Sequence, residues 1–392
     1  MGRDTLRSPV RSAIIPNAMT EMYYDHPAFG PIRQLLLDPR VSEIMINGPS
    51  RIFVERGGQI EATGLRFDSI EQLTFLVDRM LKPTGRAVST ASPYVDLCLP
   101  DGSRANVVIP PIAIDGVAVT IRRALKSFKD IGDLVGAGTL SPRMAHLLAA
   151  AVTGRLNVLF SGAAGTGKTT TLGILSAYIP TAERIITIED TAELQLRQQH
   201  VVRLECRRAN LEGRGEVTLA DLVRNALRMR PTRIIIGEVR GSEAVDMLQA
   251  ILTGHEGCLA VIHASSPVDT ISRLEMMSLS HGMGLPLWAV HKQIASAIDL
   301  VVQHDMRPDG SRKITHITEV CGVESDRVVL HDLFMYERSG EDSHGRETGQ
   351  WTCSGGEPIF LDKCARRGVE IRPDVYAPGA DPSPDVVTGD GA

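Results

Sequence analysis

The sequence predicts an α/β protein in which a parallel sheet covered by helices follows a smaller α+β domain. Three observations support this prediction. The chain has 392 residues, which is more than one hydrophobic core usually serves. Beyond about residue 135, apolar strands alternate with amphipathic helices, a pattern typical of a parallel sheet with helices on both faces. A glycine-rich phosphate-binding motif stands between the first of these strands and the helix that follows it.

The smaller domain is assigned to residues 25–135, after a leader of residues 1–24 that contains Arg, Ser and Pro without periodicity and is expected to be flexible. Its strand signals are VSEIMING, RIFVERGG, QIEATGLRF, YVDLCLPDGSRANVVIPP and GVAVTIRRAL. Between the third and fourth of these lies SIEQLTFLVDRMLKP, whose leucines recur at near-helical spacing. Ser69 is a candidate N-cap of this helix, and Pro83 lies beyond its end.

The larger domain is assigned to residues 136–375, after the polar stretch KSFKDIGDLVGAG. Its predicted strands are RLNVLFSG, RIITIED, RIIIGEV and CLAVIHA. Its predicted helices are GKTTTLGILSAY, TLADLVRNALRMR and SEAVDMLQAILTG. Beyond about residue 315 the sequence is strand-like and rich in turns. Residues 376–392, rich in Asp, Pro and Gly, are predicted to be a disordered tail.

The composition excludes several classes of protein. A net charge of -5 gives no electrostatic reason to expect a nucleic acid partner, which normally requires a basic surface. No segment approaches the roughly 18 consecutive apolar residues of a membrane span, so membrane association is expected to be indirect, through partner proteins. The 6 cysteines are scattered without a CxxC pair, which favours reduced thiols in a cytosolic protein over disulfides or a zinc module.

The motif GAAGTGKT matches the phosphate-loop pattern GxxxxGK[ST]. In such a loop the glycines let backbone N–H groups converge on phosphate oxygens. Lys168 adds a cation at the β and γ phosphates, and Thr169 offers a hydroxyl to Mg²⁺. A chance match in a glycine-rich turn is the alternative, but the flanking strand and helix disfavour it. ATP and Mg²⁺ are therefore the predicted ligands. The predicted nucleotide-binding residues are Gly162, Ala163, Ala164, Gly165, Thr166, Gly167, Lys168, Thr169 and Thr170.

Acidic residues follow two further predicted strands. Glu189 and Asp190 end RIITIED, with Glu193 just beyond, and Glu238 ends RIIIGEV. Because the ligand crevice of a parallel sheet lies outside the carboxyl ends of its strands, these acids are expected near the phosphate loop. One carboxylate can hold metal-bound water and another can orient the attacking water. Acids after strands also serve as helix caps, so a catalytic role is favoured for Glu193 and Glu238 and stays open for Glu189.

Two histidines flank the strand CLAVIHA. His263 ends that strand, and His255 follows the glycine that stops the preceding helix, so both are expected to reach the same sheet edge. Metal coordination is disfavoured because no third Cys or His ligand lies at a usual spacing. A neutral imidazole that hydrogen-bonds a carboxylate or senses the γ-phosphate fits better. A histidine flanked by apolar residues is also often a satisfied core residue.

With these residues in view, the chain resembles the secretion-superfamily ATPases, the motors of type II and type IV secretion and of type IV pili. It resembles most the CpaF/TadA family, which drives Tad/Flp pilus assembly. Four motifs coincide in order, SGAAGTGKTTTL, TIEDTAELQL, RMRPTRIIIGEVRG and LTGHEGCLAVIHASSP. Further matches occur in EIMINGPSRIFVERGG, DGSRANVVIPP and CGVESDRVVLHDLFMYERSG. The resemblance covers most residues from about 25 to 375.

The resemblance implies a RecA-like P-loop motor domain preceded by a PAS-like α+β domain. It implies that Glu193 activates the attacking water and that Thr169 and Glu238 lie near Mg²⁺, with a water molecule between Glu238 and the ion. The residues that it implies for coupling nucleotide state to subunit movement are His255, His263, Arg240, Glu189 and Asp190. It also implies that Arg104 and Arg122 of the first domain approach the phosphates, for which a guanidinium is well suited. The residues alone indicate only strand-borne cations at these two positions.

The resemblance further implies a homohexamer that acts in the cytoplasm, at the inner face of the inner membrane, on inner-membrane pilus platform proteins. Two alternatives stay open. One is a type IV secretion ATPase that moves protein or DNA–protein substrates, and the other is a nucleotide-binding scaffold with negligible turnover. Thr232 stands where the family usually has Asp. The paired-CxxC zinc module common in type II secretion motors is missing, which argues against that branch.

Overall fold

A computed structural model shows how the chain folds. The residues that it describes are 22–56, 59–84, 86–123, 128–207, 209, 213–280, 284–343 and 345–382. The chain divides into two compact units, the first made of residues 1–127 and 209–215 and the second of residues 128–208 and 216–392. Most of the predicted leader, up to residue 21, lies outside the described residues. Within the described ranges, no helix is both long enough and apolar enough to cross a membrane.

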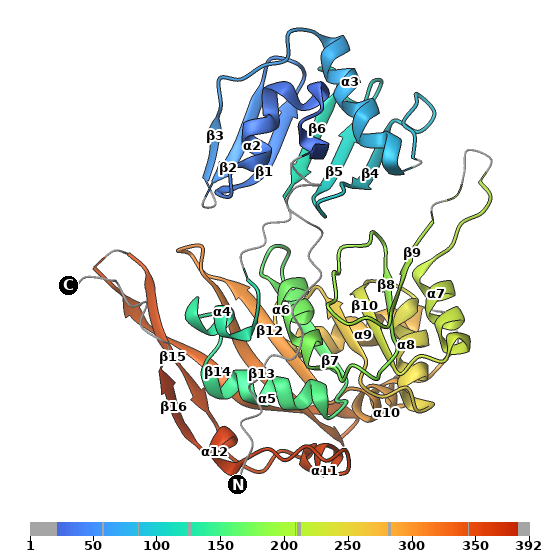
Figure 1. Ribbon diagram of the computed structural model, residues 1–392. Helices are drawn as coiled ribbons and strands as arrows, with labels where there is room; N and C mark the ends of the chain where they lie inside the picture. The colour runs from blue at the N-terminus through green and yellow to red at the C-terminus, as the bar shows by residue number, and fades with distance from the viewer. Residues whose placement is uncertain are drawn as a thin grey trace. The chain divides into compact units, whose positions relative to one another are not determined.

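The first unit is an antiparallel sheet with helices packed against one face (Figure 1). Its 6 strands follow the order β3-β2-β1-β6-β5-β4, and every neighbouring pair is antiparallel. The strands are β1 (Val41–Asn47), β2 (Ile52–Arg56), β3 (Gln59–Ala62), β4 (Tyr94–Cys98), β5 (Arg104–Val108) and β6 (Ala118–Arg122). The helical segments are η1 (Pro27–Ile32), α2 (Arg33–Leu37), α3 (Ile70–Leu81) and η2 (Lys82–Thr84).

Helix α3 starts and packs as the sequence predicts. The Ser69 hydroxyl accepts a hydrogen bond from the backbone N–H of Gln72, which satisfies one of the unpaired donors of the first turn. Leu73 and Leu76 are fully buried in the core that α3 shares with the sheet. The predicted helix is therefore confirmed. Its apolar face packs on one face of the sheet and excludes water from it.

The second unit is built on a mixed sheet of 10 strands in the order β16-β15-β14-β13-β12-β7-β11-β10-β8-β9. The six strands from β12 to β9 in this order run parallel, and the others pair antiparallel. The parallel strands are β7 (Val158–Gly162), β8 (Ile185–Glu189), β9 (Val201–Glu205), β10 (Arg233–Val239), β11 (Leu259–Ile262) and β12 (Leu300–Met306). The antiparallel strands are β13 (Arg312–Glu324), β14 (Arg327–Glu341), β15 (Glu347–Cys353) and β16 (Gly379–Pro382).

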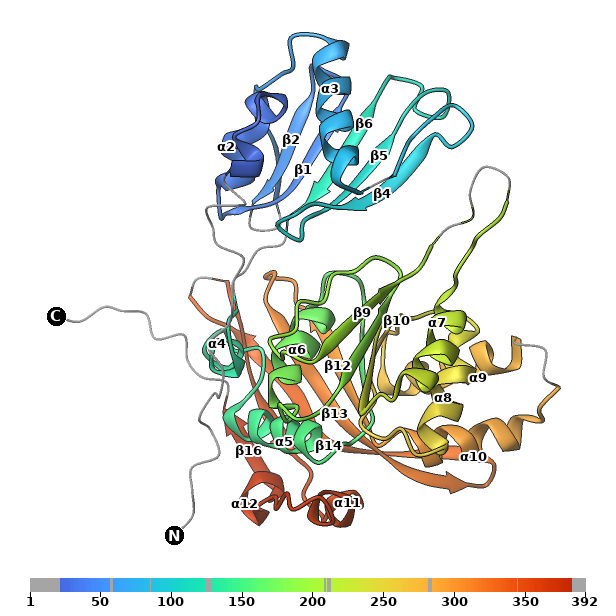
Figure 2. The ribbon, with the colours of Figure 1, turned by 45° about the vertical axis from the view of Figure 1, so that its right-hand side comes forward.

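Helices cover both faces of this sheet (Figures 1 and 2), as the alternation of strands and helices predicts. One core lies between the sheet and α4 (Ile131–Gly136), α5 (Pro142–Thr153) and α6 (Lys168–Leu175). The other core lies between the opposite face and α7 (Leu219–Ala226), α8 (Glu243–Leu252), α9 (Pro267–Ser280) and α10 (Leu287–Ala297). The short segments are η3 (Ser176–Tyr178), η4 (Leu227–Met229), α11 (Leu361–Ala365) and α12 (Pro373–Tyr376). The α/β fold class predicted from the sequence is confirmed.

Three features differ from the expected arrangement. The sheet is mixed, because β13 to β16 extend its parallel part with antiparallel strands. Helix α4, capped by Asp130, lies inside the polar stretch KSFKDIGDLVGAG, and the unit boundary falls at residues 127 and 128. Strand β16 pairs with β15, so the segment assigned to the tail contributes a strand through residue 382, and the rest of that segment lies outside the described residues.

Candidate functional site

The phosphate loop leaves the fully buried strand β7 and enters α6, as the motif requires. Gly162, Gly165 and Gly167 have φ values of 145°, 77° and 98°, which L side chains rarely adopt. A Cβ on Gly162 would collide with the backbone carbonyl of His304 and lie 2.8 Å from the Thr166 hydroxyl. The loop therefore requires glycine at this position for space as well as for backbone conformation.

Lys168, the first residue of α6, lies beneath this loop and is only 5% exposed. Its Nζ donates a hydrogen bond to the carbonyl of Ala163 at 2.6 Å, and the Thr166 hydroxyl donates to the same carbonyl at 2.9 Å. Nζ also lies 3.4 Å from Nδ1 of His263. The ammonium group is thus held at the inner side of the loop, next to the backbone N–H groups at the start of α6.

His263 stands between Lys168 and Glu238. Strands β10 and β11 are parallel neighbours, so their carboxyl ends carry Glu238 and His263 to one sheet edge. Nε2 of His263 lies 3.6 Å from a carboxylate oxygen of Glu238. A neutral ring with its proton on Nε2 can accept from the Lys168 ammonium group at Nδ1 and present its N–H to Glu238. Burial and, next, Lys168 lower the pKa of His263, while Glu238 raises it. The lowered pKa agrees with the neutral imidazole that the sequence predicts.

Glu189 holds the backbone that carries Glu193. Its side chain is 3% exposed, and one carboxylate oxygen accepts the backbone N–H groups of Glu193 at 2.9 Å and Leu194 at 2.8 Å. Burial raises the pKa of Glu189, and these two hydrogen bonds lower it. A Cβ on Gly237 of the neighbouring strand would lie 2.8 Å from Cγ of Glu189, so that glycine makes room for the carboxylate. The contacts of Glu189 therefore position the loop after β8.

Two further acids organise the same edge. Asp190 forms an ion pair with Arg240, with 2.8 Å between Oδ2 and Nη2. Glu243, in the first turn of α8, accepts the backbone N–H groups of Arg240 and Gly241 at 2.6 and 2.8 Å. Glu243 was not singled out from the sequence, although an acid in a first helical turn is a familiar capping signal. Together these contacts fix the turn between β10 and α8.

The expectation that His255 reaches the same edge as His263 is wrong. Helix α8 crosses back between the parallel neighbours β10 and β11, so the segment after it lies at the amino-terminal edge of the strands. There the backbone N–H of Gly257 donates to the side chain of Asn157, the residue just before β7. The His255 ring nitrogen Nδ1 lies 3.2 Å from the carbonyl of Ala250, at the end of α8. The predicted parallel sheet already implies this position, because a helix between two parallel strands returns the chain to the amino-terminal end of the second strand.

A second group of contacts supports the phosphate loop from strands far along the chain. His304, at the end of β12, is fully buried, and its Nε2 lies 3.0 Å from the hydroxyl of Thr171 in α6. Burial lowers the pKa of His304 to about 4, so its ring is neutral at physiological pH. Nε of Arg312, the first residue of β13, donates to the carbonyl of Gly165 at 2.8 Å. These residues were missed, because only the pairing of β12 with β7 brings them to the loop.

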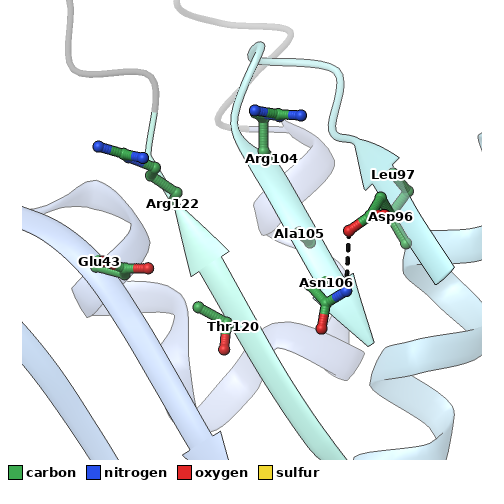
Figure 3. Close-up of a pocket in the computed structure, with 8 residues that line it drawn as sticks. All are labelled: Glu43, Asp96, Leu97, Arg104, Ala105, Asn106, Thr120 and Arg122. Carbon is green, nitrogen blue, oxygen red and sulfur yellow. Dashed lines mark hydrogen bonds between the residues drawn. The ribbon is translucent and has the colours of Figure 1, made fainter. Parts of the chain in front are cut away.

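Arg104 and Arg122 are close neighbours within the first unit. They are directly paired residues of β5 and β6, and both line a pocket of about 220 Å³ on the sheet face opposite α3 (Figure 3). Glu43 and Thr120 line the same pocket, and Asp96 accepts a hydrogen bond from Asn106 there at 2.9 Å. The apolar residues that alternate with them face the core. The pocket therefore carries two guanidinium groups on a polar surface.

The residues at the phosphate loop fit a nucleotide with Mg²⁺. Gly162, Gly165 and Gly167 leave the backbone free to approach phosphate oxygens, and the buried Lys168 supplies the cation. Thr169 and Glu238 are oxygen donors of the type that Mg²⁺ prefers. The structure groups the loop, Glu238 and His263 at one sheet edge, with the Glu193 segment held by the last residue of β8.

Comparison with known proteins points to secretion systems. A family model described as Type II/IV secretion system protein matches residues 25–344. A Mycobacterium tuberculosis protein named for conjugal transfer is 34% identical over 332 residues, which cover 79% of this chain and 94% of that protein. The type IV secretion system protein VirB11 of Brucella suis is 32% identical over 318 residues, or 74% of this chain and 88% of its own. The crystal structure of the pilus retraction motor PilT with bound ADP has a similar fold, with a TM-score of 0.52 and 21% identity over 77% of this chain and 80% of its own.

Proposed function

Because the chain belongs to the Type II/IV secretion system protein family, we propose that it is a Mg²⁺-dependent ATPase whose hydrolysis of ATP drives a membrane secretion or pilus machine. The observation that carries this proposal is the cluster at the carboxyl edge of the parallel sheet, where His263 lies between Lys168 and Glu238. A loop that only bound nucleotide would need the glycines and the lysine. The acids at the same edge supply what hydrolysis needs in addition.

We assign the steps of hydrolysis to residues of this edge. Lys168 and the N–H groups at the start of α6 bind the β and γ phosphates and stabilise the charge that develops during transfer. Glu193 orients the attacking water and accepts its proton, and Glu189 holds the backbone from which Glu193 acts. Thr169 and, through water, Glu238 would hold Mg²⁺. When bound, Mg²⁺ supplies positive charge at the phosphate oxygens.

We assign the response to the γ-phosphate to His263, which connects Lys168 to Glu238. Arg240 and Asp190 support the adjacent turn.

We further propose that the active form is a homohexamer in the cytoplasm, bound to the inner face of the inner membrane through a pilus platform protein. Tad/Flp pilus assembly is the process that the sequence motifs favour. Type IV secretion is the second candidate, because the relatives named above are a conjugal transfer protein and VirB11. Co-purification of the protein with a pilus platform protein or with components of a conjugation channel would distinguish Tad/Flp pilus assembly from type IV secretion. A coupling role of His255 would act from the opposite sheet edge and stays a prediction.

The first test is Mg²⁺-dependent ATPase activity, measured together with oligomeric mass. We expect steady ATP turnover by a hexamer, stimulated by the membrane partner. A hexamer that binds ATP but does not hydrolyse it, alone or with that partner, would contradict the proposed ATPase activity. It would favour the role of a nucleotide-binding scaffold.

Replacing Glu193 by glutamine is expected to lower kcat by about 10²–10⁴-fold, because the amide cannot accept the proton of the attacking water. ATP affinity should stay close to that of the wild type, since Glu193 does not belong to the phosphate loop. Single-turnover hydrolysis and equilibrium binding of a fluorescent ATP analogue measure the two effects separately. Glu337→Gln, at an exposed position of β14, is the matched control. Equal losses of binding and turnover would refute the water-activating role.

Replacing Arg104 or Arg122 by alanine is expected to lower kcat on the order of 10²-fold, the usual cost of removing a donor that stabilises transition-state charge. This expectation rests on our proposal that both guanidinium groups act on the phosphates. Arg51→Ala serves as the control, because Arg51 is an exposed arginine of the same unit, 3.5 Å from Asp115. Full activity in both variants would show that neither arginine acts on the phosphates.

A further inference from the structure

Outside the nucleotide site, Glu319, Cys321 and His331 bring together three different metal-binding groups. One ligand atom of each residue lies within 4.8 Å of those of the others. This group, the Glu-Cys-His cluster, is the one set of this kind found among the described residues. The sequence spacing gave no hint of it, because its residues are not arranged as a compact motif. The cluster forms only when β13 and β14 pair.

The pairing of the two strands explains how the three side chains meet. Glu319 of β13 lies directly opposite His331 of β14. The register then shifts between Val320 and Gly322, so Cys321 is the extra residue of a β-bulge. Bulges redirect side chains, and here Sγ of Cys321 lies 3.9 Å from Oε2 of Glu319.

Two of the three groups are oriented by neighbours from the segment that precedes α11. Oε1 of Glu319 accepts the backbone N–H of Phe360 at 3.1 Å, while Oε2 faces the thiol. The Ser354 hydroxyl lies 3.1 Å from Nε2 of His331. Hydrogen bonds of this kind orient the ligands of metal sites and fix the histidine tautomer. The cluster therefore has supporting contacts as well as candidate ligands.

The three candidate ligands lie at a partly covered position. Glu319 is 2% exposed, and Cys321 and His331 are half-buried. Part of the hydration shell of an ion bound there would therefore be replaced by protein groups.

We propose that Glu319, Cys321 and His331 bind a divalent transition-metal ion, with Zn²⁺ as the expected species. One thiolate, one imidazole and one carboxylate form a ligand set that suits Zn²⁺, and a water molecule completes the tetrahedral coordination. The ion would connect the β13–β14 hairpin to the segment 354–360 through the contacts of its ligands. This site is independent of the nucleotide site and of the proposed ATPase activity.

Metal binding by the full-length protein tests this proposal. The protein is stripped with a chelator and titrated with Co²⁺ in excess Mg²⁺. The absorption then reports thiolate-to-cobalt charge transfer and the visible bands of tetrahedral Co²⁺. We expect one Co²⁺ per chain, displaced by Zn²⁺. Cys321→Ser and His331→Gln should lose the charge-transfer band. Ser354→Ala should weaken binding by about tenfold or more, as expected for a residue that orients a ligand.

Matched controls separate the cluster from other thiols and imidazoles. Cys206→Ser replaces another half-buried thiol of the same unit, and His316→Gln replaces a half-buried histidine of the neighbouring strand β13. Both controls should bind Co²⁺ as the wild type does. Cys321 and His331 are chosen because they are less buried than Glu319, and circular dichroism verifies that the variants fold. Wild-type protein that takes up no more Zn²⁺ than folded Cys321→Ser, or a Co²⁺ complex without the thiolate band, overturns the proposal.

Discussion

Replacing Lys168 by alanine should reduce ATP hydrolysis on the order of 10³-fold, the upper range for removing one group that stabilises transition-state charge. The ammonium group is buried beneath the loop, where it donates to Ala163 and contacts His263. We also expect weaker binding of ATP, because the γ-phosphate loses its cation. A coupled assay of phosphate release, with binding followed by calorimetry, measures both effects.

The control for Lys168→Ala is Lys292→Ala, which removes an exposed lysine of α10 that lies over the ring of Trp288. This control should hydrolyse ATP at the wild-type rate. Unchanged turnover in a correctly folded Lys168→Ala protein would mean that the loop is not the catalytic site, and the proposed function would fail with it.

The second large effect concerns stability. Arg233→Ala should lower the free energy of unfolding of the second unit by about 3–5 kcal/mol, the usual cost of removing one partner of a buried ion pair. Arg233 is 1% exposed, and its Nε lies 2.5 Å from Glu183. Its two Nη groups donate to the carbonyls of Val152, at 2.6 Å, and Gly257, at 3.3 Å. The alanine variant leaves two carbonyls without this partner, and the buried carboxylate of Glu183 keeps only Arg155, 3.2 Å away.

Unfolding by urea, followed by tryptophan fluorescence, measures this loss. The 2 tryptophans of the chain, Trp288 and Trp351, belong to the second unit and report on it alone. Arg224→Ala is the control, because Arg224 is about half exposed in its pairs with Asp221 and Asp246. Exposed pairs contribute about 1 kcal/mol or less. A loss of similar size in both variants would show that the Arg233 contacts are worth no more than a surface pair.

The parts of the fold that the sequence predicts are those decided by neighbouring residues. Helix α3 is one example, since Ser69 and its leucines lie within a few turns of each other. The phosphate loop is another, because its glycines, Lys168 and the flanking strand are contiguous. The ends of the predicted strands RIIIGEV and CLAVIHA also placed Glu238 and His263 at the correct, carboxyl-terminal edge of the sheet. For the helix and the loop, local pattern and tertiary structure agree without any knowledge of strand pairing, and for the two strand ends it was enough that the strands are parallel.

The parts that escaped prediction depend on strand pairing and on the direction of connections. His255 lies at the opposite edge because α8 reverses the chain, as a helix between two parallel strands must, so this error came from applying the predicted topology incompletely. His304 and Arg312 reach the phosphate loop through the pairing of β12 with β7, which no local signal indicates. The Glu-Cys-His cluster needs both a register and a bulge. Register is set by the packing of whole strands, and a sequence pattern alone does not fix it.

The contacts of His304 and Arg312 also show how much of the chain supports the phosphate loop. The loop ends at α6, yet the carbonyl that closes over Gly162 and the guanidinium that holds Gly165 come from the hairpin of β12 and β13. A fragment that stopped after β11 would contain all of the motif and neither of these supports. The support of the phosphate loop is therefore a property of the assembled sheet and extends along the chain to residue 312.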